Sequence, residues 1–349
     1  MKPLIKIAGS AVALTLVAAG IAGFTPNSQL ATAATIATAA KCGTYRLNAV
    51  KLFKSTTSIM CDSKWMYVSS LEVPNDEMMV GITGWNQQVP LPFVMSDVLS
   101  TMWKIPLKPL YTKTTTATTG VGATALMVNG VPLFNATKPA QGNNQSVYQP
   151  SADPLLTGEL DHCDGHSGRG DDYHYHAYPT CLVKQLVTQT KSASAKNNQL
   201  GWSLDGFPIY GLTEKTGAPV SKLDSCKGHD IKNGIGYHYH FTTQAPYSPM
   251  CFHGVLPTEN NPEHQPAAAA SRPAGGPAKV LITAMDFNLT GKSTLTYTYN
   301  NVVGSVTYTP APSTDANKQC WQFEYLNPPP GSPGSGSQLV CRNKNGKGN

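Results

Sequence analysis

Hydrophobic and polar residues alternate along much of this chain, with the period of two that is typical of half-buried β-strands. The alternation is strongest in Lys279–Leu289 and Ser293–Thr309, and the second of these ranges predicts a β-hairpin. Helical periodicity is scarce, and only Met95–Trp103 and Leu182–Ser194 are modest helix candidates. The pattern therefore predicts a mainly β protein, a β-sandwich or a barrel-like domain, with few short helices.

Three short motifs in the middle of the chain occur twice, in the same order. The copies of each motif are separated by similar lengths of chain, and a cysteine follows each copy of the third motif. The pairs are Asn129–Phe134 with Asp205–Tyr210, Asp161–His166 with Asp224–His229, and Tyr173–His176 with Tyr237–His240. The three motifs and the cysteine that follows them make four matching elements in one order. They predict an internal duplication, with a core at 125–181 and 201–254 and a pseudo-twofold axis.

The histidines are concentrated in this duplicated segment, where eight of the nine occur. Because residues i and i+2 of a strand point to the same side, each Tyr-His-Tyr-His motif places its imidazoles on one face and its tyrosines on the other. Convergent imidazoles can hold one metal ion at about 2.0–2.1 Å. We therefore predict metal ligands at His174, His176, His238 and His240. The alternative is that these residues form the polar faces of two exposed strands.

Two further histidines recur, His166 and His229, each directly after a glycine in a predicted tight turn. Such a turn fixes the imidazole or presents it as a third ligand. Asp161 and Asp224 recur as well, and they either orient a ligand histidine through its second ring nitrogen or cap the backbone of the turn. Asp172 has no acidic counterpart in the second copy, which makes it the candidate for a general base.

The composition excludes several classes of function. Charged residues make up 13% of the 349 residues, and the net charge is only +6 without a Lys/Arg cluster, which argues against a nucleic-acid partner and against a disordered protein. The sequence contains no Gly-x-Ser-x-Gly elbow, phosphate-binding loop, dinucleotide fingerprint or His-Glu-x-x-His motif. The histidines are therefore the best candidates for chemistry.

The N-terminal segment 1–39 has the pattern of a signal peptide. Lys2 and Lys6 precede the uncharged run Ile7–Phe24, and small-residue cleavage sites follow at Ala31–Ala33 and Ala37–Ala39. The alternative is an uncleaved anchor, since a run of this length can just span a bilayer. We predict cleavage, export to the extracellular space or the periplasm, and no stable membrane insertion afterwards.

All eight cysteines lie after this segment, and an even number of cysteines in an exported chain predicts disulfides. Eight cysteines allow 105 pairings, of which the simplest joins neighbours and closes short loops worth about 3 kcal/mol each. The alternative is zinc binding by Cys163-x-x-His166 and Cys226-x-x-His229. The predicted pairs are Cys42–Cys61, Cys163–Cys181, Cys226–Cys251 and Cys320–Cys341.

Composition also divides the mature chain. Residues 266–278 are rich in Ala, Pro and Gly and predict a linker. It separates a β domain at 40–265 from a C-terminal β segment at 279–349. We expect this segment to add strands to the same domain, because so short a segment with a long Gly/Pro loop makes a thin core by itself.

The recurring motifs resemble the YHYH-domain proteins, named for the four residues at 173–176 and 237–240. The resemblance also includes Asn129–Phe134, Asp205–Gly211 and Cys251–Gly254, and it extends over residues 120–255. It implies an exported protein with a histidine-rich site and does not supply a reaction.

The residues support three functional hypotheses. The first is an exported metal-binding protein, acting as a metal-dependent hydrolase or hydratase through activated water, or as a copper oxidoreductase. The second is non-catalytic sequestration or delivery of copper or zinc, the metals that imidazole ligands suit. The third is a cell-surface adhesion or glycan-binding module. The expected partners are a metal ion and either a small molecule or cell-surface material.

Overall fold

The fold described here is that of a computed structural model. The predicted signal peptide, most of the helix candidate Met95–Trp103 and the predicted linker up to residue 276 lie outside the described residues. No helix within the described ranges is long and apolar enough to cross a membrane. The structure describes residues 42–54, 56–92, 102–118, 122–137, 147–168, 172–232, 234–257, 277–332 and 336–343.

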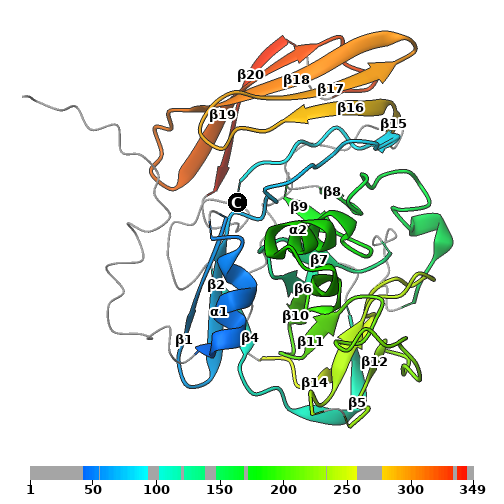
Figure 1. Ribbon diagram of the computed structural model, residues 1–349. Coiled ribbons are helices and arrows are strands. Elements are labelled where there is room, and N and C mark those ends of the chain that lie inside the picture. Colours follow the sequence, from blue (N-terminus) through cyan, green and yellow to red (C-terminus); the bar gives the residue numbers. More distant parts are fainter. Residues whose placement is uncertain are drawn as a thin grey trace, which may run out of the picture.

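The protein is mainly β, as the alternating pattern predicts. Its central element is an eight-stranded sheet with the order β12-β13-β11-β10-β6-β7-β9-β8 (Figure 1). The strands are β6 (Ala123–Met127), β7 (Pro132–Phe134), β8 (Gly165–Ser167), β9 (Tyr173–Tyr175), β10 (Gly201–Ser203), β11 (Pro208–Tyr210), β12 (Gly228–His229) and β13 (His238–His240).

The two halves of this sheet have the same topology. In the first half, β6 pairs with β7 in antiparallel fashion, β7 pairs with β9 in parallel, and β9 pairs with the antiparallel edge strand β8. In the second half, β10, β11, β13 and β12 pair in the same way and in the same order. The halves meet where β6 pairs with β10, and Leu126 lies opposite Trp202, which is its counterpart in the second copy. The repeated topology supports the predicted duplication, whose pseudo-twofold axis would pass between these two side chains.

The N-terminal residues form a smaller sheet beside a short helix. Helix α1 (Thr44–Lys51) precedes β1 (Thr57–Cys61), which pairs with β2 (Trp65–Ser70), and β2 pairs with β4 (Trp103–Pro106). Two strand pairs complete this part of the fold. They are β3 (Gly84–Trp85) with β15 (Ala278–Lys279), and β5 (Tyr111–Ala117) with β14 (Cys251–Gly254).

The helix candidate at 182–194 corresponds to α2 (Thr180–Thr190), followed by the 3-10 helix η3 (Ala193–Asn197). Leu182, Val183 and Leu186 are the buried face of α2, and Lys191 ends it with the left-handed backbone of a C-cap. A second 3-10 helix, η2, spans Pro150–Ala152.

The C-terminal residues form an antiparallel sheet of their own instead of adding strands to the central sheet. The predicted hairpin is present as β17 and β18, joined by Asn300 and Asn301, which both have the positive φ of a tight hairpin turn. The sheet order is β16 (Leu281–Asp286), β17 (Ser293–Tyr299), β18 (Val302–Ala311), β19 (Lys318–Leu326) and β20 (Gly336–Asn343).

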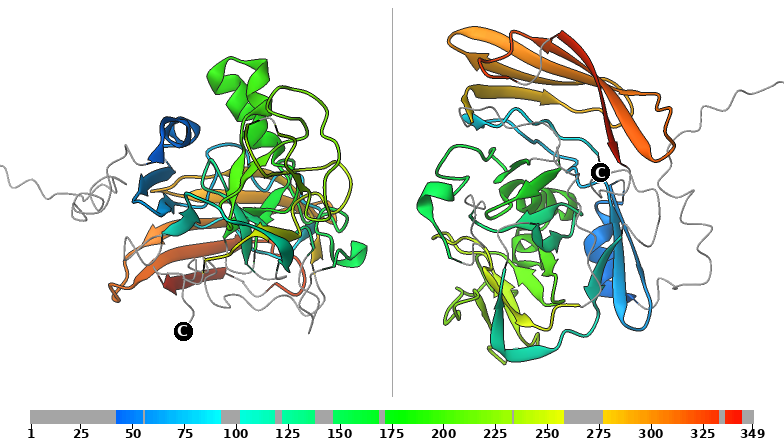
Figure 2. Two further views of the ribbon diagram at one scale, coloured as in Figure 1. Left: turned by 90° about the horizontal axis from the view of Figure 1, so that it is seen from below. Right: turned by 180° about the vertical axis from the view of Figure 1, so that it is seen from behind.

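This C-terminal sheet forms one end of the molecule in Figures 1 and 2 and packs on the segment around residues 81–90. The rings of Trp85 and Tyr297 lie 5.1 Å apart, and the Tyr308 hydroxyl donates to the carbonyl of Pro90 at 2.6 Å. One continuous hydrophobic core therefore joins the C-terminal sheet to the rest of the described chain.

Four disulfides join neighbouring cysteines, with sequence separations of 19, 18, 25 and 21 residues. They are the four pairs that the sequence predicts, so neither cysteine of the two Cys-x-x-His motifs is free to bind zinc. The pairs are Cys42–Cys61, Cys163–Cys181, Cys226–Cys251 and Cys320–Cys341.

Candidate functional site

Strand pairing brings three histidines together in each half of the central sheet. In the first half β8 pairs with β9 so that His166 lies directly opposite His174. In the second half β12 pairs with β13 in the same register, and His229 lies opposite His238. Opposite residues of antiparallel strands share a face. The second histidine of each motif, two residues further along, lies on that face too.

The first histidine centre consists of His166, His174 and His176. The Nε2 atom of His176 lies 3.2 Å from that of His166 and 3.1 Å from that of His174. The three residues are between 3% and 6% exposed, so the centre is buried. Phe134 closes one side, because its ring stacks on His174 with the centroids 3.9 Å apart.

The second histidine centre consists of His229, His238 and His240 together with the carboxylate of Glu214. One oxygen of Glu214, Oε1, lies 3.1 Å from the Nε2 atom of His229 and 3.6 Å from that of His240. The other oxygen, Oε2, lies 3.4 Å from the Nε2 atom of His238. All four residues are buried, and burial lowers the pKa of His240 to about 4, which keeps this imidazole neutral at pH 7.

In five of these six rings, the opposite nitrogen is held by the protein backbone. Nδ1 must carry the hydrogen in each such contact, because a carbonyl oxygen only accepts. A ring that is neutral then presents the lone pair of Nε2 to the centre of its cluster. The contacts join Nδ1 of His174 to Asp172 O (3.1 Å), of His176 to Asn135 O (2.6 Å), of His229 to Ser221 O (2.8 Å), of His238 to Gly236 O (2.8 Å) and of His240 to Gly211 O (2.9 Å).

This arrangement has the geometry and the chemistry of a metal site. Tetrahedral ligands at about 2.0–2.1 Å from a metal ion are about 3.4 Å from one another. The Nε2 separations of 3.1 and 3.2 Å in the first centre are close to this value. Lone pairs that face one another in a buried space repel unless a cation lies between them. Each centre therefore has a donor set that can hold a transition-metal ion.

Asp161 and Asp224 bind tyrosine and backbone rather than the ligand histidines of their own half. Asp161 accepts hydrogen bonds from the Tyr173 hydroxyl at 2.7 Å and from the amides of Cys163 and Gly165. Burial raises the pKa of Asp161 to about 7, and these hydrogen bonds oppose that shift. In the second half Asp224 makes the equivalent contacts with Tyr237, Cys226 and Gly228. Both residues therefore cap the backbone of the turn that carries His166 or His229, which is one of the two roles that the sequence suggests for them.

The position of Asp172 argues against a general-base role. Its carboxylate oxygen Oδ2 lies 3.3 Å from the Nδ1 atom of His174, on the ring edge away from the Nε2 cluster. A base acting on a ligand of the centre has to reach the Nε2 side. It is the main-chain carbonyl of Asp172 that holds Nδ1 of His174, and the buried carboxylate lies beside the same edge of the ring.

Glu214 is the residue of the second centre that the sequence does not reveal. It lies in a turn after β11, where its amide donates to Ala218 O and its carbonyl accepts from the amide of Gly217. It belongs to none of the recurring motifs. Only the folded chain, which brings this turn against β12 and β13, identifies it as a candidate ligand.

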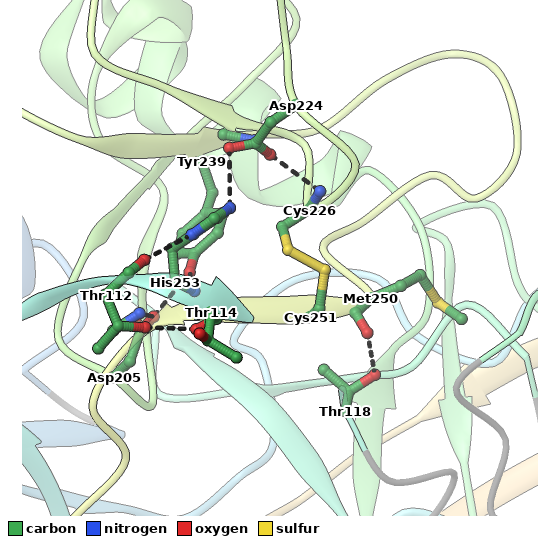
Figure 3. The surroundings of a disulfide bond; sticks show 12 residues. Thr112, Thr114, Thr118, Asp205, Asp224, Cys226, Tyr239, Met250, Cys251 and His253 are labelled. Carbon is green, nitrogen blue, oxygen red and sulfur yellow. Dashed lines mark hydrogen bonds and ion pairs between the residues drawn. A yellow bond between two sulfur atoms is a disulfide. The ribbon is translucent and has the colours of Figure 1, made fainter. Parts of the chain in front are cut away.

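A third group of potential ligands surrounds the disulfide Cys226–Cys251 (Figure 3). His253 lies between the carbonyl of Thr112, 2.9 Å from its Nδ1 atom, and the Asp224 carboxylate, 3.3 Å from its Nε2 atom. Because Cys226 is in a disulfide, it offers no thiolate. These contacts serve to tie β14 to β5 and to the turn of Asp224.

Residues 102–218 match the family model described as YHYH protein. The matched segment includes the first Tyr-His-Tyr-His motif and the whole first histidine centre, and it ends before the second motif. No curated protein and no solved structure matches the chain. The match over residues 102–218 supports the resemblance to the YHYH-domain proteins that the recurring motifs indicate.

Proposed function

We propose that this protein binds two transition-metal ions, one in each histidine centre. The observation that carries the proposal is the orientation of the rings. Main-chain carbonyls hold Nδ1 of five of the six rings, and the Nε2 atoms converge in a buried space in both halves. A ligand set in which three imidazoles provide the donors suits zinc and copper.

The proposed location is outside the cytoplasm, in the extracellular space or the periplasm. Four disulfides support it, because disulfides persist in oxidising compartments. The signal-peptide pattern of residues 1–39 points the same way.

The second centre supports a non-catalytic role. It has four protein groups, three imidazoles and the Glu214 carboxylate, and a four-coordinate closed site is typical of structural or storage zinc. Metal sequestration or a structural metal is therefore the function that this half fits best.

The first centre favours a second candidate function, a metal-dependent hydrolase or hydratase. Three imidazoles come together there, which is the number of protein ligands in catalytic zinc sites. A metal ion bound there would supply an activated water.

The glycan-binding hypothesis loses its main support. Tyr173, Tyr175 and Tyr239 are fully buried, and Tyr237 is only 8% exposed. The histidines of both motifs are buried as well. The motif therefore offers no exposed rings on which a sugar can stack.

The direct test is the metal content of the exported protein, purified without a histidine tag. We expect two equivalents of zinc or copper per chain by elemental analysis. Removing the metal with a chelator should lower the melting temperature, because an ion that binds only the folded state stabilises it. A chain that contains no metal, takes up none and melts unchanged in chelator would contradict the proposal.

A further inference from the structure

The disulfide Cys226–Cys251 lies beside an imidazole and a carboxylate, outside both histidine centres (Figure 3). Ligand atoms of Asp224, Cys226 and His253 all lie within 4.8 Å of one another. The Nε2 atom of His253 is 3.3 Å from Oδ2 of Asp224, close to the separation of about 3.4 Å between two ligands of a tetrahedral metal ion. Two sulfurs, one imidazole and one carboxylate make a set of four donors that suits zinc once the sulfurs are thiolates.

The imidazole and the carboxylate are held by groups other than the sulfurs. Nδ1 of His253 contacts the carbonyl of Thr112 at 2.9 Å, and a carbonyl only accepts, so Nδ1 carries the hydrogen. The lone pair of the neutral ring is then on Nε2, the atom beside Asp224. Asp224 in turn accepts through Oδ1 from the amides of Cys226 and Gly228, at 2.8 and 3.0 Å. Both groups therefore keep their positions whether or not the sulfurs are bonded.

The backbone beside each cysteine is also fixed by hydrogen bonds. Cys251 begins β14, which pairs with β5, and the carbonyl of Met250 accepts from the amide and the hydroxyl of Thr118 at 3.0 and 2.9 Å. Cys226 lies in the turn that Asp224 caps. With Cα atoms 4.9 Å apart, the two cysteines therefore remain neighbours when the bond between their sulfurs is open.

The first half of the duplicated core has a corresponding disulfide, Cys163–Cys181, with a different neighbour. Asp161 caps its turn and accepts from the amide of Cys163 at 2.8 Å. Two residues after the second cysteine of the pair, the first half has Val183 where the second half has His253. A valine side chain has no lone pair to offer. This disulfide is therefore a control within the same chain.

On these grounds we propose that Asp224, Cys226, Cys251 and His253 bind one zinc ion in the dithiol form of the chain. The disulfide and the zinc ion exclude each other. Every chain passes through the dithiol form, because a disulfide is made from two thiols after synthesis. The Asp224 side chain, 32% exposed, gives the ion access from solvent.

The chemistry balances with a dithiol as reductant. The reductant supplies two electrons and two protons, which convert the disulfide to two thiols, and becomes a disulfide itself. Zinc then displaces the two thiol protons to water as it binds the thiolates. In the reverse direction, oxidation of the pair releases the ion.

Cys251→Ser tests the proposal without a reductant, because it frees the thiol of Cys226 and leaves the other three disulfides in place. Co²⁺ takes the place of zinc, since a thiolate ligand gives cobalt a near-ultraviolet charge-transfer band that imidazole and carboxylate ligands do not give. We expect this band in C251S, saturating at one Co²⁺ per chain, and its absence from the wild type. The double variant C251S with H253A should bind this cobalt at least tenfold more weakly.

Cys181→Ser is the matched control, because it frees Cys163 beside Val183 and should not give a band at the cobalt concentration that saturates C251S. Mass spectrometry after alkylation verifies which thiol is free, and near-UV circular dichroism verifies the fold. A folded C251S chain with a free thiol and no band would overturn the proposal. An equal band in C181S, or one that is unchanged by H253A, would overturn it too.

If C251S does not fold, the wild type treated with one equivalent of a phosphine gives the same measurement. The phosphine opens the disulfide with one water molecule and becomes a phosphine oxide. Chains that alkylation shows to be reduced at Cys226 and Cys251 should give the band, and its absence from them contradicts the proposal. Cobalt in the histidine centres is followed separately by its visible d–d absorption, so a failure of the metal binding proposed above is distinguishable.

Discussion

Replacing His174 and His176 with alanine should remove one of two bound metal ions and leave the other in place. The reason is the distance between the centres. Five inter-strand steps of about 4.8 Å, on the order of 24 Å along the sheet, separate β9 from β13 in the strand order. Imidazoles of the two motifs therefore cannot share an ion. Elemental analysis of the purified variant checks this, with one equivalent expected in place of two.

The reciprocal variant, with H238A and H240A, should keep the metal of the first centre. His162→Ala is a suitable control, because the His162 side chain is 64% exposed and belongs to neither centre. It should retain both ions. Near-UV circular dichroism confirms that each variant is folded. If either double variant lost all its metal while still folded, the two centres would not be independent.

Asp205→Ala should be among the most destabilising single substitutions in the central sheet. The Asp205 carboxylate accepts hydrogen bonds from the Tyr239 hydroxyl at 2.6 Å and from the amides of Phe207 and Gly254. Removing it leaves three donors without their partner, each at a cost of about 1–3 kcal/mol. We expect the free energy of unfolding to fall by about 3–5 kcal/mol, which is a large part of the roughly 5–15 kcal/mol that is typical of a folded protein. Urea unfolding with the disulfides intact measures it.

The chain itself provides the matched control, Asp205→Asn. Asn129 takes this position in the first half, where its Oδ1 accepts from the amide of Val131 and its Nδ2 donates to the Tyr175 hydroxyl. An asparagine at 205 keeps the acceptor for Phe207 and loses the one for Gly254. It should therefore cost about 1–2 kcal/mol. Equal losses for Ala and Asn would show that the carboxamide does not replace the carboxylate here.

Much of the candidate site is predictable from the sequence because its signals are local. Strand alternation alone places His174 and His176 on one face and Tyr173 and Tyr175 on the other, and the structure shows this arrangement. Short separations make the neighbouring cysteines the simplest pairs. The recurring turns bring His166 and His229 to their places because an aspartate caps each turn.

The remaining features of the fold and of the site depend on long-range pairing, which no local sequence pattern encodes. The strand order separates the two motifs into two centres, and the sequence does not contain that order. Glu214 reaches the second centre from an ordinary turn, and Asp172 faces the far edge of its histidine. The C-terminal strands alternate as predicted, but alternation does not indicate which sheet they join.

The pairing of β6 with β10, with Leu126 opposite Trp202, has a consequence for any attempt to divide the chain. Either half of the central sheet, expressed alone, would expose β6 or β10 as an unpaired, apolar edge strand, because these two strands now pair with each other. Such an edge recruits another chain, by ordered pairing or by aggregation. Because the two halves repeat one topology and meet through equivalent strands, a second copy of the same half is the partner that fits this edge best. An isolated half is therefore expected to be soluble only as a homodimer.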